Sequence, residues 1–399
     1  MRRATDLGRR VLGGVVCGAV LVVVGVTVFL RERTPGGAAS LSVRGHPLSR
    51  LPIRRVAELP VAEGTLFGVW DKIRLPASAQ WPDLVHALRF WDTTVFPGAG
   101  GWSREKVLQR FCDSALFEQE FGKTPFHQVT QHGLKVRTLD RAERDKTDRV
   151  GDAHTDQTVC VLGTLGVSSS QAIRVRGRDF AMADVVRYAA ANCSAGHEMP
   201  WTAVALALYL PPKARWVNKF GQTYTMDEVC RDVLQVELGQ GPCYGMHTLE
   251  ALTVLLYVDG EERTLRAGTR HQASRFLAEA LGALEGSQRG NGSWGPEWAG
   301  NPVPDGAPTA GREALKWRIS LTAHALEWLA VAPEEFRVDG KRIHAACEFL
   351  TRTILAEPAS EIESAFAEHS HAGNALKVWF PESWKRWTDR TVRSRSAKP

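Results

Sequence analysis

A cysteine and a histidine stand four residues apart in GPCYGMHTLEALTVLLY, residues 241–257, where a Gly-Pro pair gives way to an apolar helical pattern. Cys243 and His247 are both of types that bind zinc. His154 in DAHTDQ and His197 in AGHEMPW also stand just before helical patterns. Three such ligands around zinc leave a fourth position open for water or substrate. The segment therefore predicts a metal site or an acid/base site where several helices begin.

The spacing of the three histidines supports a shared location. His154, His197 and His247 follow one another at intervals close to the length of one helical hairpin. A repeated hairpin places successive inner helices in register, so these side chains should gather at one rim. The candidate metal ligands are Cys243, His247, His154 and His197, with zinc as the expected ion. The candidate catalytic residues are His154, Glu198, Cys243 and His247.

Other interpretations of these residues remain open. Each histidine or cysteine could instead cap or pack at its own helix start, and the rim could be a polar pocket without metal. Asp152, Asp156 and Glu198 could supply the paired carboxylates of a glycosidase, although the sequence gives no distance between them. A fourth histidine, His324 in LTAHALEWL, falls inside a longer helical run, so its place at the rim is not fixed.

Helical periodicity dominates the chain from Trp81 onward, with almost none of the alternation that is typical of strands. Three helical segments are nearly uncharged and rich in small residues, while the helices that follow them carry charge on one face. A helix that is apolar all round must be covered on every side, so these three should line an interior. The pattern predicts an all-α fold, an α/α toroid of helical hairpins over residues 81–356. The helical segments are 81–91, 103–121, 155–167, 182–193, 199–210, 225–238, 247–258, 271–286, 312–331 and 340–355.

A short motif carries a resemblance to a known superfamily. QRGNGSW, residues 288–294, resembles the Q-x-x-x-G-x-W motif of squalene and terpenoid cyclases. In that motif Gln288 would cap the next helix, Gly292 would permit the turn and Trp294 would stack on the capped end. The resemblance implies the toroid shared by terpenoid cyclases, protein prenyltransferases and complement-type thioester domains.

The activity motifs of those families are absent from the sequence. It contains no Asp-x-Asp-Asp run of the kind that protonates an alkene, and Cys243 is followed by Tyr-Gly-Met instead of the Gly-Glu-Gln of a thioester. The prenyltransferases also use an aspartate two positions before the zinc-binding cysteine, where this chain has Gly241. The resemblance therefore implies a fold and leaves the activity undefined.

The N-terminal region reads as a membrane anchor. Residues 11–30 form an uncharged apolar run of twenty, long enough to cross a bilayer. Four arginines among residues 1–10 place that end in the cytoplasm and the bulk of the chain outside the inner membrane. A cleaved signal peptide, with GGAAS at 36–40 as the cleavage zone, is the alternative. Residues 31–80 are predicted to form a proline-rich tether. Residues 357–399 are predicted to form a polar basic tail with at most one more helix.

Charge and cysteine content limit the classes of partner and of covalent cross-link that this sequence can have. The formal charge of +6 is spread along the chain without a basic stripe among aromatics, which argues against nucleic acid as a partner. Six cysteines follow residue 30, none of them spaced as CxxC, so we expect at most one disulfide. We expect a membrane-anchored extracytoplasmic domain that binds a protein, glycan or hydrophobic ligand at the cell envelope. The alternative is a metal-dependent or acid/base enzyme that acts on a lipid-like or extended substrate in the ring cavity.

Overall fold

Helices make up most of the structure, as the periodicity predicts. The computed structural model describes residues 41–48, 60–92, 96–98, 100–144, 149–301 and 310–396. Its contacts group Gly36–Pro399 as one unit, to which all of these residues belong. The proposed anchor at 11–30 and its cytoplasmic flank at 1–10 lie outside the described residues. Within the described ranges, no helix has the length and apolarity needed to span a bilayer.

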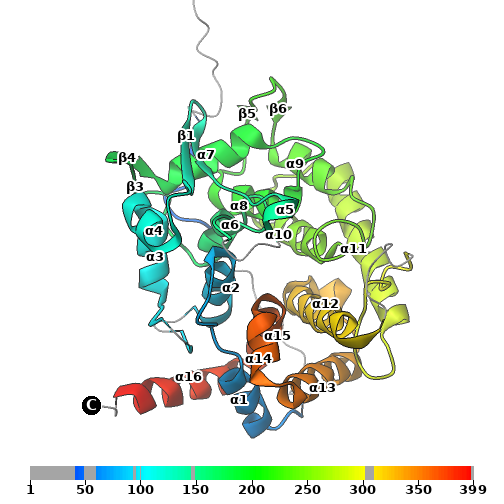
Figure 1. Ribbon diagram of the computed structural model, residues 1–399. Helices are drawn as coiled ribbons and strands as arrows, with labels where there is room; N and C mark the ends of the chain where they lie inside the picture. The colour runs from blue at the N-terminus through cyan, green and yellow to red at the C-terminus, as the bar shows by residue number, and fades with distance from the viewer. Residues whose placement is uncertain are drawn as a thin grey trace, which may run out of the picture. The chain divides into compact units, whose positions relative to one another are not determined.

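Six helices pack in a closed order, each against the next and the last against the first. Figure 1 shows them around a common centre. Every residue of one of them, α8, is buried. Because a helix of this kind needs cover on all sides, other helices pack outside it. In contact order the six are α2 (Trp81–Trp91), α6 (Gln157–Thr164), α8 (Met199–Tyr209), α10 (Met246–Glu262), α12 (Gly311–Val331) and α15 (Phe366–Trp379).

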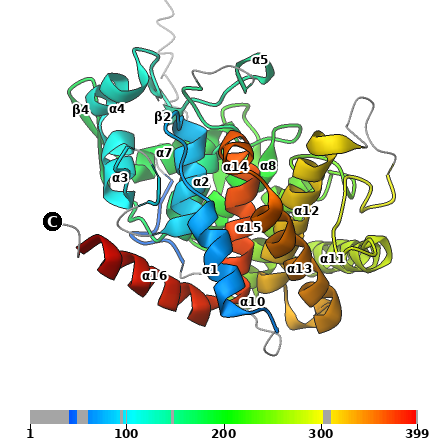
Figure 2. The ribbon, with the colours of Figure 1, turned by 60° about the horizontal axis from the view of Figure 1, so that its bottom comes forward.

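A second set of helices covers the first from outside. α7 packs on α8, α9 and α11 pack on α10, and α13 packs on α12. α1 and α16 both contact α15, and they contact each other (Figure 2). These outer helices are α1 (Glu63–Lys72), α7 (Met182–Asn192), α9 (Met226–Val233), α11 (Ala267–Ser287), α13 (Gly340–Ala356) and α16 (Pro381–Ser396). The shorter helices are α3 (Arg104–Cys112), α4 (Ser114–Phe121), α5 (Arg141–Arg144), α14 (Ala359–Ser364) and a 3-10 turn at Glu334–Phe336.

Two local features differ from the helical prediction. The single helix expected over 103–121 is broken at Asp113, whose carboxylate caps α4 by accepting from the backbone N–H groups of Ala115 and Leu116. Three short antiparallel hairpins also interrupt the helices. Arg176 and Gly177 in one of them have the positive φ angles that a tight hairpin turn needs. The strands are β1 (His127–Thr130), β2 (Gly133–Val136), β3 (Ala172–Val175), β4 (Arg178–Ala181), β5 (Trp216–Val217) and β6 (Thr223–Tyr224).

The folded region extends beyond both of the bounds that the sequence suggested. α1 lies within the predicted tether at 31–80, and α14, α15 and α16 lie within the predicted tail at 357–399. α15 belongs to the inner set because small residues let it approach α2 closely. A Cβ atom at Gly373 would overlap the Phe90 ring, and the Gly373 carbonyl accepts from the Trp70 indole at 3.2 Å. The expectation of at most one more helix after residue 356 was therefore wrong.

The turn that follows α11 uses the motif residues as tertiary anchors. The Trp294 side chain is fully buried, and its indole N–H donates to the Leu284 carbonyl in the last turn of α11 at 2.8 Å. The Gln288 amide donates to the Arg342 carbonyl at the start of α13 at 2.9 Å. Gly292 has φ +90°, where a side chain would also overlap the Ala345 carbonyl. Trp294 thus satisfies a carbonyl of the preceding helix, while Gln288 contacts α13 and not α12, the next helix along the chain.

Candidate metal centre

The loop before α10 holds Cys243 in an unusual backbone conformation. Gly241, Cys243, Tyr244 and Gly245 all have positive φ, at 88°, 48°, 53° and 82°. Residues with a β-carbon pay roughly 1–3 kcal/mol for such strained conformations, which cluster at functional sites. The Trp298 indole stabilises the loop by donating to the Tyr244 carbonyl at 2.8 Å. The fold therefore fixes the direction of the Cys243 side chain at some energetic cost.

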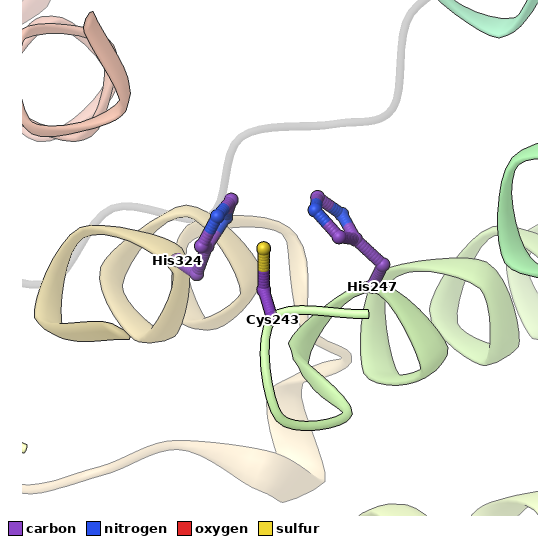
Figure 3. Close-up of side chains that lie close together, drawn as sticks. All are labelled: Cys243, His247 and His324. Carbon is purple, nitrogen blue, oxygen red and sulfur yellow. The ribbon is translucent and has the colours of Figure 1, made fainter. Parts of the chain in front are cut away.

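Three side chains converge there to form what we call the Cys243 cluster: Cys243, His247 and His324. Figure 3 shows the sulfur between the two imidazole rings, with His247 on α10 and His324 on α12. One potential ligand atom from each residue lies within 4.8 Å of the other two. Both histidines are 3% exposed and Cys243 is half-buried. Tetrahedral zinc at ~2.0–2.3 Å holds its ligand atoms roughly 3.5 Å apart, so side-chain movements of about 1 Å complete the fit.

A glutamate carboxylate lies close to the Nδ1 atom of each of the two histidines. His247 Nδ1 lies 3.5 Å from Glu250 Oε2, and His324 Nδ1 lies 3.1 Å from Glu327 Oε2. A carboxylate that accepts from Nδ1–H leaves Nε2 unprotonated and available as a ligand, the usual arrangement around zinc-binding histidines. His324 Nε2 is buried with no hydrogen-bond partner in the described part of the chain. A metal ion would give that atom its missing partner.

Arg89 joins the two carboxylates, and we call Arg89, Glu250 and Glu327 the Arg89 layer. The Arg89 Nη2 atom lies 3.0 Å from Glu250 Oε1 and 3.4 Å from Glu327 Oε2. Glu327 also accepts from His371 Nδ1 at 3.0 Å and from the Asn374 amide at 2.5 Å. Buried carboxylates require this degree of pairing. Glu327 therefore connects helices α2, α12 and α15.

Electrostatics favour the thiolate form of Cys243. Burial raises the pKa of the thiol, but His324 and His247 outweigh burial and hold that pKa well below its usual range. Burial lowers the pKa of His324, yet the Cys243 thiolate and Glu327 raise it to about 10. Burial and the charges of His324 and Arg89 keep the pKa of His371 well below its usual range. Thiolate is the form of cysteine that binds metals.

The net charge of the buried groups is the one that a single divalent cation would neutralise. The Cys243 thiolate, Glu250 and Glu327 carry three negative charges, and Arg89 carries one positive charge. One divalent ion balances the remainder, as would two protons placed on His247 and His324. Because a metal ion replaces such protons when it binds, the raised pKa values mark where positive charge is needed.

The other predicted site residues lie at different distances from this cluster. His154 Nδ1 donates to the Glu198 carboxylate at 2.5 Å, and the centroid of its ring lies 5.9 Å from that of His247. This pair is half-buried beside the cluster and is not part of the ligand group. His197 is exposed, 6.3 Å from the Phe220 ring, so its assignment as a metal ligand was wrong. It sits in the turn before α8, and its side chain points to the surface.

The proposed pair of glycosidase carboxylates serves to anchor helices. Asp152 is fully buried and accepts from the Trp81 indole at 3.1 Å and from the Thr158 backbone N–H at 2.8 Å. Asp156 accepts from the Thr202 hydroxyl at 2.5 Å. These bonds join the starts of inner helices. Burial, and to a lesser extent the charge of a neighbouring acid, raises the pKa of Asp152 to about 7 and that of Asp156 to about 6. Each of the three carboxylates has a protein partner, which for Glu198 is His154.

His324 was not predicted as a ligand, and Arg89, Glu250, Glu327 and His371 were not predicted as site residues. A repeated spacing could have revealed part of the site: His247-Thr-Leu-Glu250 and His324-Ala-Leu-Glu327 share an H-x-x-E pattern, each in a stretch with no other charged residue, 246–258 and 319–331. Residues three apart lie on one helix face. A charged side chain on a buried helix face needs a partner of opposite charge. The repeated pattern therefore indicates a site that contains buried charges. No family model, curated protein or solved structure matches this chain.

Proposed function

We propose that this chain is a zinc-dependent enzyme, the alternative that the sequence left open. The observation that carries the proposal is the Cys243 cluster, with a thiolate facing two histidines whose Nδ1 atoms are held by carboxylates. Structural zinc sites use four protein ligands, whereas three ligands are typical of catalytic sites. A binding domain without catalysis would not need strained backbone, buried charge and an unpartnered histidine nitrogen at one place.

The reaction class that fits this site is metal-assisted hydrolysis of a carbonyl or phosphoryl compound that arrives from the rim. When bound, zinc would act as a Lewis acid at its open position. The half-buried pair of His154 and Glu198 lies beside the cluster and can hold or pass a proton. Burial, and to a lesser extent the charge of Cys243, raises the pKa of Glu368 in the first turn of α15, so this carboxyl is a second candidate to hold a proton.

We propose the α/α toroid as the architecture around this site. Its support is the closed contact order of α2, α6, α8, α10, α12 and α15, with the remaining long helices outside them. The buried turn at Trp294 also supports the resemblance to the terpenoid cyclase and prenyltransferase superfamily. The squalene-type and thioester chemistries are not part of this proposal, because their motifs are absent from the sequence.

We also propose that residues 11–30 anchor the chain in the inner membrane, with residues 1–10 in the cytoplasm and the folded domain outside. The arginine asymmetry supports this orientation. A reporter enzyme fused after Pro399 should be active only outside the cytoplasm. Activity of a reporter that works only in the cytoplasm would refute the orientation.

Purified full-length protein should contain one zinc ion per chain by elemental analysis. Cys243→Ala and His324→Ala should each reduce the bound zinc at least about tenfold, because each removes one of three ligands. His197→Ala is the matched control and should keep the full zinc content, since this exposed histidine lies away from the cluster. Protein without zinc, or equal zinc in all four samples, would favour the non-catalytic binding domain.

A further inference from the structure

The loop before α10 contains the sequence GPCYG, residues 241–245, with a glycine two positions before and two positions after the cysteine. In a G-x-S-x-G turn, the central serine nucleophile sits on strained backbone just before a helix, which exposes its side-chain oxygen to substrate. Cys243 occupies the place of that serine, with φ 48°, and α10 begins three residues later at Met246. Residues 234–245, between α9 and α10, take the place of the strand that usually precedes such a turn.

The neighbours of Cys243 have the other features of a nucleophile turn. Gly245 has φ 82°, and a Cβ atom there would lie 3.0 Å from the Gln240 carbonyl oxygen, so the tight turn requires glycine. The backbone N–H of Tyr244 makes no backbone hydrogen bond to another described residue. In a nucleophile turn the N–H of this next residue stabilises the oxyanion that forms when the nucleophile attacks a carbonyl.

Two histidines of fixed orientation flank the sulfur (Figure 3). One nitrogen of each ring belongs to the group of atoms within 4.8 Å of one another that includes Cys243 Sγ. Glu250 lies at Nδ1 of His247 and Glu327 at Nδ1 of His324, which leaves both Nε2 atoms to accept a proton. A nucleophile, a base and a carboxylate that orients the base form the arrangement that activates cysteine for acyl transfer.

The two histidines differ in their access to a substrate. Among the described residues, His324 Nε2 is fully enclosed without a hydrogen-bond partner, whereas His247 Nε2 is not. His247 is therefore the histidine that can exchange a proton with a substrate. Cys243 is half-buried, and its sulfur lies between the two rings (Figure 3), which leaves room for a slender acyl group.

We infer that the chain has a second activity when no metal is bound, in which Cys243 is the nucleophile that accepts the acyl group of a small, unbranched carboxylic ester. The sulfur attacks the carbonyl carbon while the thiol proton moves to His247 Nε2. The ester C–O bond then breaks, and the leaving oxygen takes that proton to form the alcohol. Water attacks the resulting thioester and gives a proton to the same nitrogen, which returns it to the sulfur as the carboxylic acid leaves.

This activity does not rest on the zinc proposal, because it uses only the side chains and backbone of the Cys243 loop and its two histidines. The sulfur cannot attack a carbonyl while it is bound to a metal ion, so the two activities exclude each other at any one moment. Zinc added to the unmodified protein should therefore stop the acyl transfer. Acyl transfer that continues with zinc present would count against the metal centre alone.

The probe is para-nitrophenyl acetate, added to full-length protein in the presence of a chelator. Peptide mass spectrometry should show that Cys243 gains an acetyl group at least about tenfold faster than Cys112. Cys112 is the matched control because it is the other half-buried cysteine in the described part of the chain. Equal acetylation of the two cysteines, or none at Cys243, would overturn the inference.

Variants test the role of the histidine. His247→Ala should slow the acetylation of Cys243 at least about tenfold, and added imidazole should restore part of the rate by entering the space left by the ring. His247→Gln keeps more of the side-chain volume and should be equally slow, while Cys112→Ala should react at the unmodified rate. Unchanged acetylation of Cys243 in both His247 variants would overturn the inference.

Discussion

Replacing Glu327 by glutamine should lower the free energy of unfolding by about 3–5 kcal/mol, because it removes one partner of a buried ion pair. The carboxylate is 5% exposed and accepts from His324, His371 and Asn374 while it faces Arg89. Glutamine would leave Arg89 undercompensated and turn an amide N–H₂ group toward one of these donors. Urea denaturation in the presence of a chelator measures the loss without any contribution from metal.

The matched control is Glu250→Gln. Glu250 also pairs with Arg89, but 24% of its side chain is exposed, so water can solvate the groups left behind. Its loss should be clearly smaller, about 1–2 kcal/mol. If Glu327→Gln stays within ~0.5 kcal/mol of the unmodified protein, the Arg89 layer does not hold the inner helices together as described.

Replacing Trp294 by alanine should cost about 3–5 kcal/mol, the range for large aromatic residues truncated in cores. The indole is fully buried and also satisfies the Leu284 carbonyl at the end of α11. Its loss leaves both a cavity and a carbonyl without its donor. Chemical denaturation at constant protein concentration is the measurement.

Two further substitutions separate these contributions. Trp294→Phe keeps most of the ring and removes the N–H donor, so it should cost about 1–3 kcal/mol. Gln288→Ala removes only the half-buried amide that contacts Arg342 and should cost less than Trp294→Ala. A change below ~0.5 kcal/mol for Trp294→Ala would show that the motif turn is not an anchor and that the resemblance is accidental.

Local patterns predicted most helices, because an apolar stripe or a cap acts within a few residues. The segment 81–91 was placed to the residue. The prediction failed at α15, where FAEHSHAGNALKVW mixes charge with small residues and reads as polar. Its burial depends on tertiary contacts with α2 and α12, which no local pattern contains.

The site was predictable in part for the same reason. Cys243 and His247 are neighbours in sequence, so their meeting follows from one helix start. His324 comes from another helix and reaches the cluster from its middle, a position that depends on how α12 packs beside α10. The prediction that His197 is a ligand failed because the side chain of a residue next to a helix start can point either inward or outward. Only the packing of the following turn decides which.

The contact between α2 and α15 has a consequence for how the protein is made. Lys377 donates to the Arg89 and Phe90 carbonyls across sequence separations of 288 and 287 residues. A ribosome adding ~5–20 residues per second needs roughly 15–60 s to cover that distance. Until α15 has been made, the face of α2 that α15 covers stays exposed, and until α12 has been made the guanidinium of Arg89 lacks Glu327. The N-terminal helices can therefore pair locally during synthesis, but the buried charges meet only when nearly the whole chain has emerged.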